Sequence, residues 1–216
     1  MKKITKITTQ QNVGRYNIFL DDEFYCGVTE DTLIKLELKK GKELDDDMLK
    51  ELGEEENKNA CFNYALFLLG RKGYFKKALI DKLKQKEYSE EAIDFTIDKL
   101  ISLGYINDEN LSRSYANDQK KFNKKGPKYI EYNLRAKGVD AETISRVMEE
   151  SYNDDEGIEN CTALIAKKID GYRKKAKSNY ELKGKLYAFL AGRGYKSDVI
   201  RKAIESFPLE DDSEEY

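Results

Sequence analysis

The stretch PKYIEYNLRAKGVDAETISRVM, residues 127–148, decides the fold class because its apolar residues recur every three or four positions. This spacing is typical of helices that bury one face. Pro127 suits the first turn of a helix, Gly138 suits the left-handed position that ends one, and Asp140 is a preferred N-cap. The stretch therefore predicts two helices joined by a short turn.

The same pattern occurs three times when Leu83, Leu134 and Leu190 are taken as anchors, which lie 51 and 56 residues apart. Apolar or aromatic residues stand four positions before each anchor and five, ten and fourteen positions after it. These residues are Leu79, Tyr88, Ile93 and Ile97 in the first copy, Ile130, Val139, Ile144 and Met148 in the second, and Leu186, Tyr195, Ile200 and Ile204 in the third. The recurrence predicts tandem units, each with room for three helices.

The predicted fold is mainly α, with three tandem three-helix repeats that form an elongated, curved solenoid after a small N-terminal β-hairpin and helical region. A unit of about 50 residues has a small core, so neighbouring units are expected to stack. We place the boundaries at 1–56 for the N-terminal region, 57–107, 108–155 and 156–208 for the repeats, and 209–216 for an acidic tail. A long surface suits a polymeric partner better than a small metabolite.

The N-terminal region has a different texture. The run RYNIFLDDEFYCGVT, residues 15–29, predicts two strands joined by a tight turn at Asp21 and Asp22, and we expect this hairpin to pair with ITKIT upstream or to pack on the segment downstream of it. Thr29 is a plausible N-cap for a helix beginning at the next residue. Segment 43–56 carries eight acidic residues against one lysine, which fits either a solvated helix or a linker.

The composition argues against an enzyme. The chain has no histidine, and neither GxGxxG nor GxxxxGK[ST] occurs among its 14 glycines. Cys26, Cys61 and Cys161 are isolated, so we interpret them as small buried hydrophobes and expect no disulfide framework, zinc site or other metal or cofactor. No apolar run is long enough for a membrane span and the N-terminus lacks a signal peptide's apolar stretch, which favours a cytoplasmic protein.

Positive charge is concentrated although the formal net charge is only −2. Segments 71–86 and 120–137 each carry seven Lys or Arg against one acid, and segment 166–185 carries eight against two. All three lie at corresponding places, around the second helix of each unit. Stacking is therefore expected to align them into a basic stripe that attracts phosphates or an acidic protein surface, although a lysine run is also typical of ordinary solvated helix surface.

Two finer hypotheses concern segment 120–137. A helix that starts at Gly126 and Pro127 directs free backbone N–H groups at an anion, although the pattern is first of all that of an ordinary helix start. The aromatic residues among the lysines suit stacking on nucleic-acid bases, but we expect most of them to belong to the core. They are Tyr74, Phe75, Phe122, Tyr129 and Tyr132.

Several motifs resemble the RecX family of bacterial recombination regulators. They are Tyr64-Ala65-Leu66 with Leu69-Gly70-Arg71, LGYIND at 103–108, KKGPKYIEYNLRAKGV at 124–139, GRGYKSDVIRKAI at 192–204, and the stretch 15–44, which is similar to the N-terminal extension of Gram-positive members. The resemblance covers about residues 3–207. It departs at RKGYFKKAL, where Ala78 stands in place of an expected acidic residue, so any role of that acid is in doubt here.

The resemblance implies a non-enzymatic regulator that binds the RecA–DNA filament in its helical groove. We expect the chain to be a monomer. Such a protein restrains the ATPase, strand exchange and coprotease activities of RecA, within DNA repair, recombination and the SOS response. Some members also bind DNA, single- or double-stranded. Charge and repeat position select the expected contact residues, which are Arg71, Lys72, Lys76, Lys124, Lys125, Lys128, Arg135, Arg173, Lys174, Lys175 and Arg193.

Two other functions stay open from the residues alone. One is a general nucleic-acid-binding helical module that acts without RecA, because three-helix units resemble helix-turn-helix arrangements. The other is a scaffold repeat protein with an acidic protein partner. The acidic tail is expected to be a disordered, solubilising end, with competition for the basic stripe as the alternative.

Overall fold

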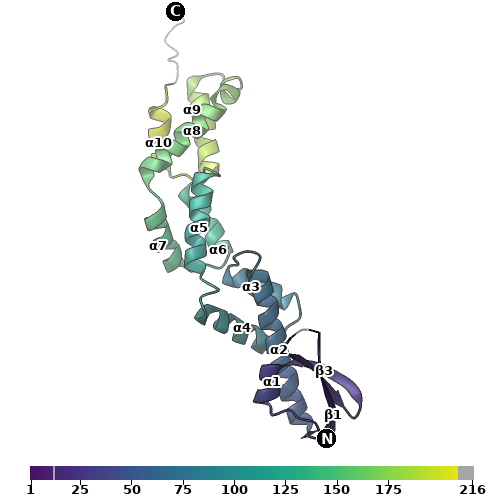
Figure 1. The fold of residues 1–216 in the computed structure, drawn as a ribbon. Helices are drawn as coiled ribbons and strands as arrows, with labels where there is room; N and C mark the ends of the chain where they lie inside the picture. Colours follow the sequence, from purple (N-terminus) through teal and green to yellow (C-terminus); the bar gives the residue numbers. More distant parts are fainter. Residues whose placement is uncertain (12, 209–216) are drawn as a thin grey trace, which may run out of the picture. The chain divides into compact units, whose positions relative to one another are not determined.

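The computed structural model describes residues 1–11 and 13–208 and consists mainly of helices (Figure 1). It divides into two compact units, Met1–Ile106 and a second unit that begins at Asn107. The predicted acidic tail, residues 209–216, lies outside the described residues. The unit that starts at Met1 holds a small sheet and the first repeat, and the unit that starts at Asn107 holds the second and third repeats.

The elements occur in the order expected from the sequence. The strands are β1 (Lys2–Thr9), β2 (Arg15–Leu20), β3 (Glu23–Thr29) and β4 (Glu43–Leu44). The helices are α1 (Glu30–Lys35), α2 (Asp46–Leu69), α3 (Lys76–Lys84), α4 (Glu90–Ser102), α5 (Asp108–Lys121), α6 (Pro127–Ala136), α7 (Ala141–Ser151), α8 (Asp154–Arg173), α9 (Asn179–Gly192) and α10 (Ser197–Glu205).

The N-terminal sheet has the strand order β3-β2-β1-β4, and all its pairings are antiparallel. Strands β2 and β3 meet at Asp21 and Asp22, whose φ values of 49° and 69° place both in the left-handed region that a tight hairpin turn requires. The predicted hairpin and its pairing with the upstream strand are confirmed. The two-residue strand β4 was not expected from the sequence.

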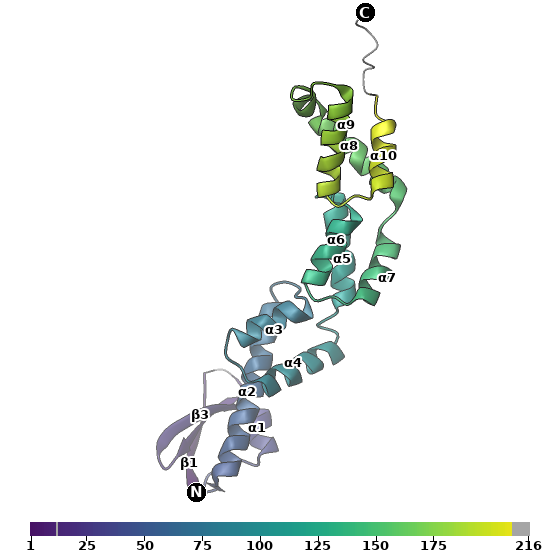
Figure 2. The same ribbon diagram turned by 180° about the vertical axis from the view of Figure 1, so that it is seen from behind.

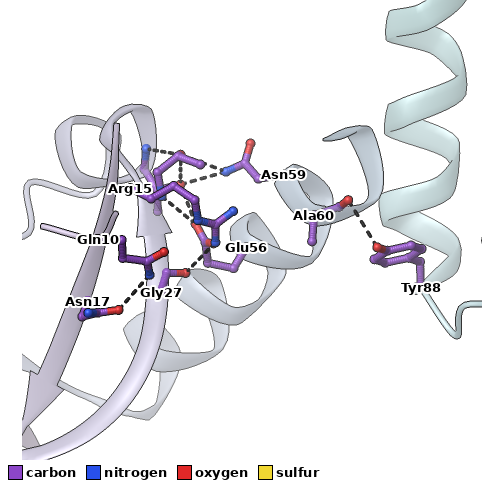
Figure 3. Close-up of polar contacts among 10 residues, drawn as sticks. Gln10, Arg15, Asn17, Gly27, Glu56, Asn59, Ala60 and Tyr88 are labelled. Carbon is purple, nitrogen blue, oxygen red and sulfur yellow. Dashed lines mark hydrogen bonds and ion pairs between the residues drawn. The ribbon is translucent and has the colours of Figure 1, made fainter. Parts of the chain in front are cut away.

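A polar network fixes the sheet and α1 to α2. Glu56 of α2 accepts hydrogen bonds from the Thr29 backbone N–H (3.3 Å) and the Thr32 hydroxyl (3.0 Å), and it pairs with Arg15 at 3.5 Å. Asn59, one turn further along α2, donates to the Thr32 hydroxyl at 2.8 Å. Figure 3 shows these side chains between β3 and α2. The predicted N-cap is confirmed, since the Thr29 hydroxyl accepts from the Thr32 N–H.

Helix α2 is continuous over 24 residues and passes through residue 57, where we place the start of the first repeat. Its N-terminal part buries Leu52 in the core of the sheet, and its C-terminal part buries Cys61 and Ala65 in the core of the first repeat. The acidic segment 43–56 is therefore mostly helix and not a linker. Asp45 caps this helix by accepting from the Met48 N–H at 2.8 Å.

Three helices form each repeat, namely α2 to α4, α5 to α7, and α8 to α10. Of the fifteen aligned apolar positions, fourteen are buried and Tyr88 is half-buried, with its hydroxyl donating to the Ala60 carbonyl at 3.3 Å (Figure 3). Ser89 and Asp140 act as N-caps, and Gly138 and Gly194 have left-handed φ values of 88° and 91°. The predicted repeat pattern is confirmed.

The three cysteines are free thiols, two of them buried as expected. Cys26 is only half-buried, because it lies on β3 at the edge of the sheet. Burial raises the pKa of the Cys161 thiol to about 12 and that of Cys26 to about 11, with Glu56 adding to the shift at Cys26. Among residues 1–11 and 13–208, none of the helices combines the length and apolar character that crossing a membrane requires.

Candidate partner-binding surface

The second helices of the two C-terminal repeats lie on the same side of their unit. Figures 1 and 2, which view the chain from opposite directions, both place α6 and α9 along one side and α7 and α10 along the other. Exposed cations on or next to these two helices include Lys128, Arg135, Lys174, Lys175 and Lys183. Within this unit, two of the three predicted basic segments therefore share a side.

The residues around Gly126 meet the turn between α9 and α10 in an inter-repeat joint, which we define as residues 123–128 against residues 193–195. The Gly126 N–H donates to the Arg193 carbonyl at 2.9 Å, and the Lys128 N–H donates to the Gly194 carbonyl at 3.0 Å. The Tyr195 hydroxyl donates to the Lys124 carbonyl at 3.0 Å. Two turns that lie nearly seventy residues apart in the sequence thus bond backbone to backbone.

Two glycines make this approach possible. A Cβ atom at Gly126 would lie 2.4 Å from the carbonyl carbon and oxygen of Gly194, and a Cβ at Gly194 would lie 2.4 Å from the Tyr129 nitrogen. Gly126 has a φ of −82°, which any residue adopts, so its glycine is required by space and not by backbone conformation. Packing in the joint therefore requires glycine at both positions.

The joint rules out the anion site proposed for the start of α6. The N–H groups of Gly126 and Lys128 are already satisfied by the carbonyls of the α9–α10 turn, and both Gly126 and Pro127 are buried. The ordinary helix start that we also considered is the correct interpretation. Sequence reasoning missed the joint because nothing in the sequence pairs residue 126 with residue 194.

Arg193 has a structural task within the joint. Its guanidinium donates to the Lys124 carbonyl at 3.1 Å and to the Asn123 carbonyl, and it lies 5.7 Å from the ring centre of Phe189. Burial, reinforced by the positive charge of Arg193, lowers the pKa of Lys125. The Lys125 ammonium lies 3.9 Å from the ring centre of Tyr129. Lys124, Lys125 and Arg193 are thus brought together, each half-buried.

Two other cations of segment 120–137 also have internal partners. Lys120 is 8% exposed, donates to the Ser151 carbonyl at 2.6 Å and pairs with Glu156 at 2.8 Å, so it holds α5 against the turn between α7 and α8. The Lys137 ammonium lies 5.1 Å from the ring centre of Tyr115. The segment therefore presents fewer cations to solvent than its composition suggests.

The remaining residues expected in contacts are exposed. In the first repeat, Arg71 lies over the ring of Phe67 at 5.7 Å and Lys72 over Tyr74 at 4.9 Å, while Lys76 begins α3. In the second repeat, Arg135 pairs with Glu131 at 3.7 Å and Lys128 comes directly after Pro127 on α6. In the third, Arg173, Lys174 and Lys175 form the end of α8 and the loop after it.

The aromatic residues divide into two groups. Phe75 is buried, and Tyr74 and Tyr129 are half-buried, as expected for core residues. Phe122 and Tyr132 are 78% and 72% exposed, so the expectation that most of these five aromatic residues belong to the core is confirmed for the other three. Phe122 follows the end of α5, and Tyr132 lies on α6. Phe67 on α2, which we did not select, is 58% exposed.

The described part of the chain contains no group of three or more carboxylate or cysteine side chains that could hold a metal ion. The largest pKa shifts belong to Tyr152, Tyr195, Cys26 and Cys161, and burial is the main cause at each. Because burial causes them, these pKa shifts reflect the packing of the four side chains. The arrangement as a whole is that of a helical repeat protein.

Family comparisons agree with this class and make it specific. The family model of the regulatory protein RecX N-terminal domain matches residues 2–45. The models of the first, second and third three-helix domains of RecX match residues 61–100, 107–148 and 154–204. The chain therefore belongs to the RecX family of regulatory proteins.

Individual relatives span nearly the whole chain. The regulatory protein RecX of Bacillus subtilis (strain 168) is 38% identical over 99% of this chain and 80% of its own length. That of Clostridium beijerinckii is 34% identical over 95% of both chains. A crystal structure of regulatory protein RecX superposes with a TM-score of 0.83 and 26% identity, covering 95% of this chain and 100% of the other.

Proposed function

We propose that the chain is an inhibitor of the RecA recombinase that binds in the groove of the RecA–DNA filament through the exposed cations of its second helices. Bound there, it restrains ATPase activity, strand exchange and coprotease activity by occupying the groove, without chemistry of its own. Membership of the RecX family supports RecA as the partner, as the sequence resemblance implies.

The common side of α6 and α9 is the observation that carries the proposal. The cations on or next to these helices reach solvent from two helices and one loop. Helix α9, with 14 residues, is itself about 20 Å long. A polyanionic or acidic filament attracts such a surface at long range, and the attraction weakens with salt. The alignment of the first-repeat cations with this side stays a prediction.

A charge-reversal experiment tests the proposal. The variant Arg173→Glu/Lys174→Glu/Lys175→Glu changes three consecutive exposed residues at the end of α8 and in the loop after it. Because each reversed charge turns attraction into repulsion, we expect inhibition of the DNA-dependent ATPase of RecA to need about tenfold more protein. Unchanged inhibition, with an unchanged helical circular dichroism spectrum, would remove this loop from the contact surface.

The matched control is Lys2→Glu/Lys39→Glu/Lys40→Glu, which makes the same change in net charge. These three lysines are exposed in the N-terminal region, outside all three basic segments. We expect this control to inhibit RecA like the unaltered chain. If both variants lose inhibition equally, net charge alone acts and the surface has no specific role.

A second candidate function is general nucleic-acid binding without RecA, and exposed rings beside cations favour it. Phe122 and Tyr132 are exposed, and in the sequence they stand before and after Lys128. In the first repeat, Phe67 stacks on Tyr64 with a centroid distance of 6.4 Å, and the Arg71 guanidinium lies 5.7 Å from the ring centre of Phe67. Rings that alternate with cations suit stacking on unpaired bases.

Gel-shift titration with single-stranded DNA, with and without RecA, separates these functions. The RecA proposal predicts that Phe122→Ala/Tyr132→Ala leaves filament inhibition nearly intact. The nucleic-acid alternative predicts that the same variant weakens DNA binding and inhibition together, by about tenfold. Equal inhibition of an unrelated DNA-coating filament would also favour the alternative.

A further inference from the structure

A groove lies on the third repeat between α9 and α10. Its volume is about 910 Å³, and its lining includes Tyr180, Lys183, Gly184, Tyr187, Arg201 and Ile204. Both helices pack on the same hydrophobic core, so the groove is a fixed feature of the third repeat.

The middle of the groove is open because Gly184 has no side chain. A Cβ atom there would meet nothing within 4 Å, although the residue lies inside a 14-residue helix. Ala188, one turn further along the same face, adds only a methyl group. The Tyr187 ring also lines the groove, and its hydroxyl donates to the Ser197 hydroxyl at 2.8 Å, which holds the ring in place. The groove therefore has room for one large side chain from outside.

Rings and aliphatic groups form much of the surface around this space. Ile204 lines it from α10 and is 7% exposed. Tyr180, one turn before Gly184 on α9, is 89% exposed. Tyrosine is enriched among the residues that carry most of the binding energy at protein interfaces. An exposed tyrosine next to an open, apolar space is typical of a surface that buries a side chain of a partner.

Two cations of the groove lack an acidic partner. Lys183 of α9 and Arg201 of α10 are exposed and make no ion pair with any other residue that the structure describes. Lys185 is different, because it pairs with Glu181 at 2.9 Å. A ligand with carboxylates can therefore pair with Lys183 and Arg201 without breaking an existing ion pair.

The acids at one end of the groove distinguish between two kinds of anionic ligand. Glu181 and Glu205 line the end at which α9 begins and α10 ends. A nucleic-acid strand repeats its negative charge at every nucleotide, so a strand along the groove would bring phosphates close to both carboxylates. A peptide carries carboxylates only at particular positions, so it can match the cations and avoid the acids. A peptide is therefore the better match for this groove.

We propose that the α9–α10 groove binds a short acidic segment of a partner protein. One large apolar side chain of the segment enters the space above Gly184, and carboxylates on either side of it pair with Lys183 and Arg201. The α9 wall from Tyr180 to Ala188 spans about 12 Å, which about four extended residues match. Such recognition goes beyond the proposed function and depends on neither RecA nor DNA.

Amide chemical shifts of the full chain test the binding. The probe is a synthetic peptide with blocked ends that holds one phenylalanine between two pairs of aspartates. We expect saturable shifts at the Gly184 and Ala188 amides. Replacing the phenylalanine by alanine should weaken binding about tenfold, because the buried ring contributes most of the affinity. A peptide with lysines in place of the aspartates should not bind.

Three results of this titration overturn the proposal. The first is the absence of saturable shifts at the Gly184 and Ala188 amides with millimolar phenylalanine peptide. The second is equal binding of the alanine peptide, because the groove then takes no apolar anchor. The third is equal binding of the lysine peptide, because the two cations then select no carboxylates.

Two exposed glycines of the third repeat give a matched pair of variants. Gly184 on α9 lines the groove and Gly171 on α8 does not, yet a Cβ at either position would meet nothing within 4 Å. Both Gly184→Leu and Gly171→Leu should keep the helical circular dichroism, because leucine has the higher helix propensity. Gly184→Leu fills the space for the anchor and should weaken binding of the phenylalanine peptide about tenfold, whereas Gly171→Leu should leave it unchanged. Unaltered binding by a folded Gly184→Leu variant overturns the groove as the site.

Neighbouring cations on α10 test the charges in the same assay. Arg201 lines the groove and Lys202 does not, although both are exposed. Because a reversed charge turns attraction into repulsion, Arg201→Glu should weaken peptide binding about tenfold, and Lys202→Glu by about twofold at most. Equal effects of the two reversals overturn the proposal, since net charge alone would then explain the binding.

An oligonucleotide decides between the two kinds of anionic ligand. We expect a single-stranded oligomer of thymidine nucleotides to leave the Gly184 and Ala188 amides unshifted. Displacement of the phenylalanine peptide by this oligomer at a lower concentration overturns the proposal, because a nucleic acid is then the occupant. The assay contains no RecA, so its result is independent of filament inhibition.

Discussion

Gly126 in the second repeat and Phe75 in the first occupy the same position, eight residues before the buried anchor leucine. Both precede a helix with nearly the same extended backbone, with φ and ψ of −82° and 169° at Gly126 and −66° and 144° at Phe75. Phe75 is buried, whereas Gly126 leaves its space to the backbone of another repeat. The same local backbone thus places a buried side chain in the first repeat and a contact between two repeats in the second. That contact is possible because Gly126 has no side chain.

The turn after the second helix offers the same comparison. Gly194, Gly138 and Glu87 stand at equivalent positions, and all three have left-handed φ values, of 91°, 88° and 60°. The conformation belongs to the repeat, since even a glutamate adopts it. Close contact with another repeat distinguishes Gly194 from Glu87, because Glu87 carries an exposed side chain whereas a Cβ at Gly194 would meet Tyr129. Conformation alone therefore does not identify a joint.

The largest expected effect comes from adding one methyl group at Gly194. Gly194→Ala combines left-handed strain with a clash against the backbone of Tyr129, so it should destabilise the C-terminal unit by about 3 kcal/mol. Urea unfolding followed by circular dichroism measures the change. Gly104→Ala is the control for strain alone, because φ there is 74° and the space is open, and it should cost about 1 kcal/mol.

A substitution at Glu87 tests the reverse change, from a side chain to glycine at the equivalent left-handed position. Glu87→Gly relieves a left-handed conformation at an exposed position, so it should stabilise the first unit by about 0.5–1 kcal/mol. A Gly194→Ala variant no less stable than Gly104→Ala would break the comparison, since the joint would then tolerate a side chain.

Gly126→Ala tests space without conformational strain. The added methyl group meets the Gly194 carbonyl at 2.4 Å while φ remains favourable, so we expect a loss of about 2 kcal/mol. Gly53→Ala, in open space within α2, should instead stabilise the chain by about 0.5–1 kcal/mol. Urea unfolding measures the change in the free energy of unfolding for each variant, and we expect the two changes to have opposite signs. Like signs would contradict the packing argument.

Arg193→Lys tests the bonds of the joint and should have a smaller effect. A lysine lacks the planar fork that serves both the Lys124 and the Asn123 carbonyls, so about 1 kcal/mol should be lost. Arg135→Lys, at an exposed pair with Glu131, should change the free energy of unfolding by about 0.3 kcal/mol. Hydrogen exchange of the Gly126 amide reports whether the joint opens.

The pH dependence at Lys125 is the smallest expected effect. Its pKa is lowered in the folded state, mainly by burial and further by Arg193, so the folded chain releases this proton at lower pH than the unfolded chain. Between the two pKa values the unfolded state binds more protons, and stability rises with pH. Lys125→Met should therefore be the more stable variant at neutral pH, by a margin that shrinks as the pH rises from the lowered pKa of Lys125 toward about 10.4, the ordinary pKa of lysine. A margin independent of pH would contradict this cause.

The repeat fold was predictable because each repeat records its own core. The aligned apolar residues around Leu83, Leu134 and Leu190 specify which face of each helix is buried, and cap residues such as Ser89 and Asp140 specify where helices begin. The extent of α2 was less predictable. Its acidic first half has few apolar residues, and the helix forms there because Leu52 and Glu56 contact the sheet and α1.

The candidate surface was predictable only as a distribution of charge. Composition located the basic segments, but it did not distinguish exposed cations such as Lys128 from Lys120, whose partners Ser151 and Glu156 are more than thirty residues away. Arg193 was selected for its charge and proved to be a bond donor in the joint. Such assignments depend on contacts between repeats, which leave no periodic trace in the sequence.

Because α2 is one continuous helix, its length fixes how the core of the first repeat is rotated about the helix axis relative to the core of the sheet. Leu52 and Cys61 point into two different cores from one helix, and each residue turns a helix by about 100°. Inserting a single residue between them would swing one core around the axis relative to the other, whereas seven residues, close to two turns, would restore the original direction. Lengths of this helix in natural variants should therefore change in steps of whole turns.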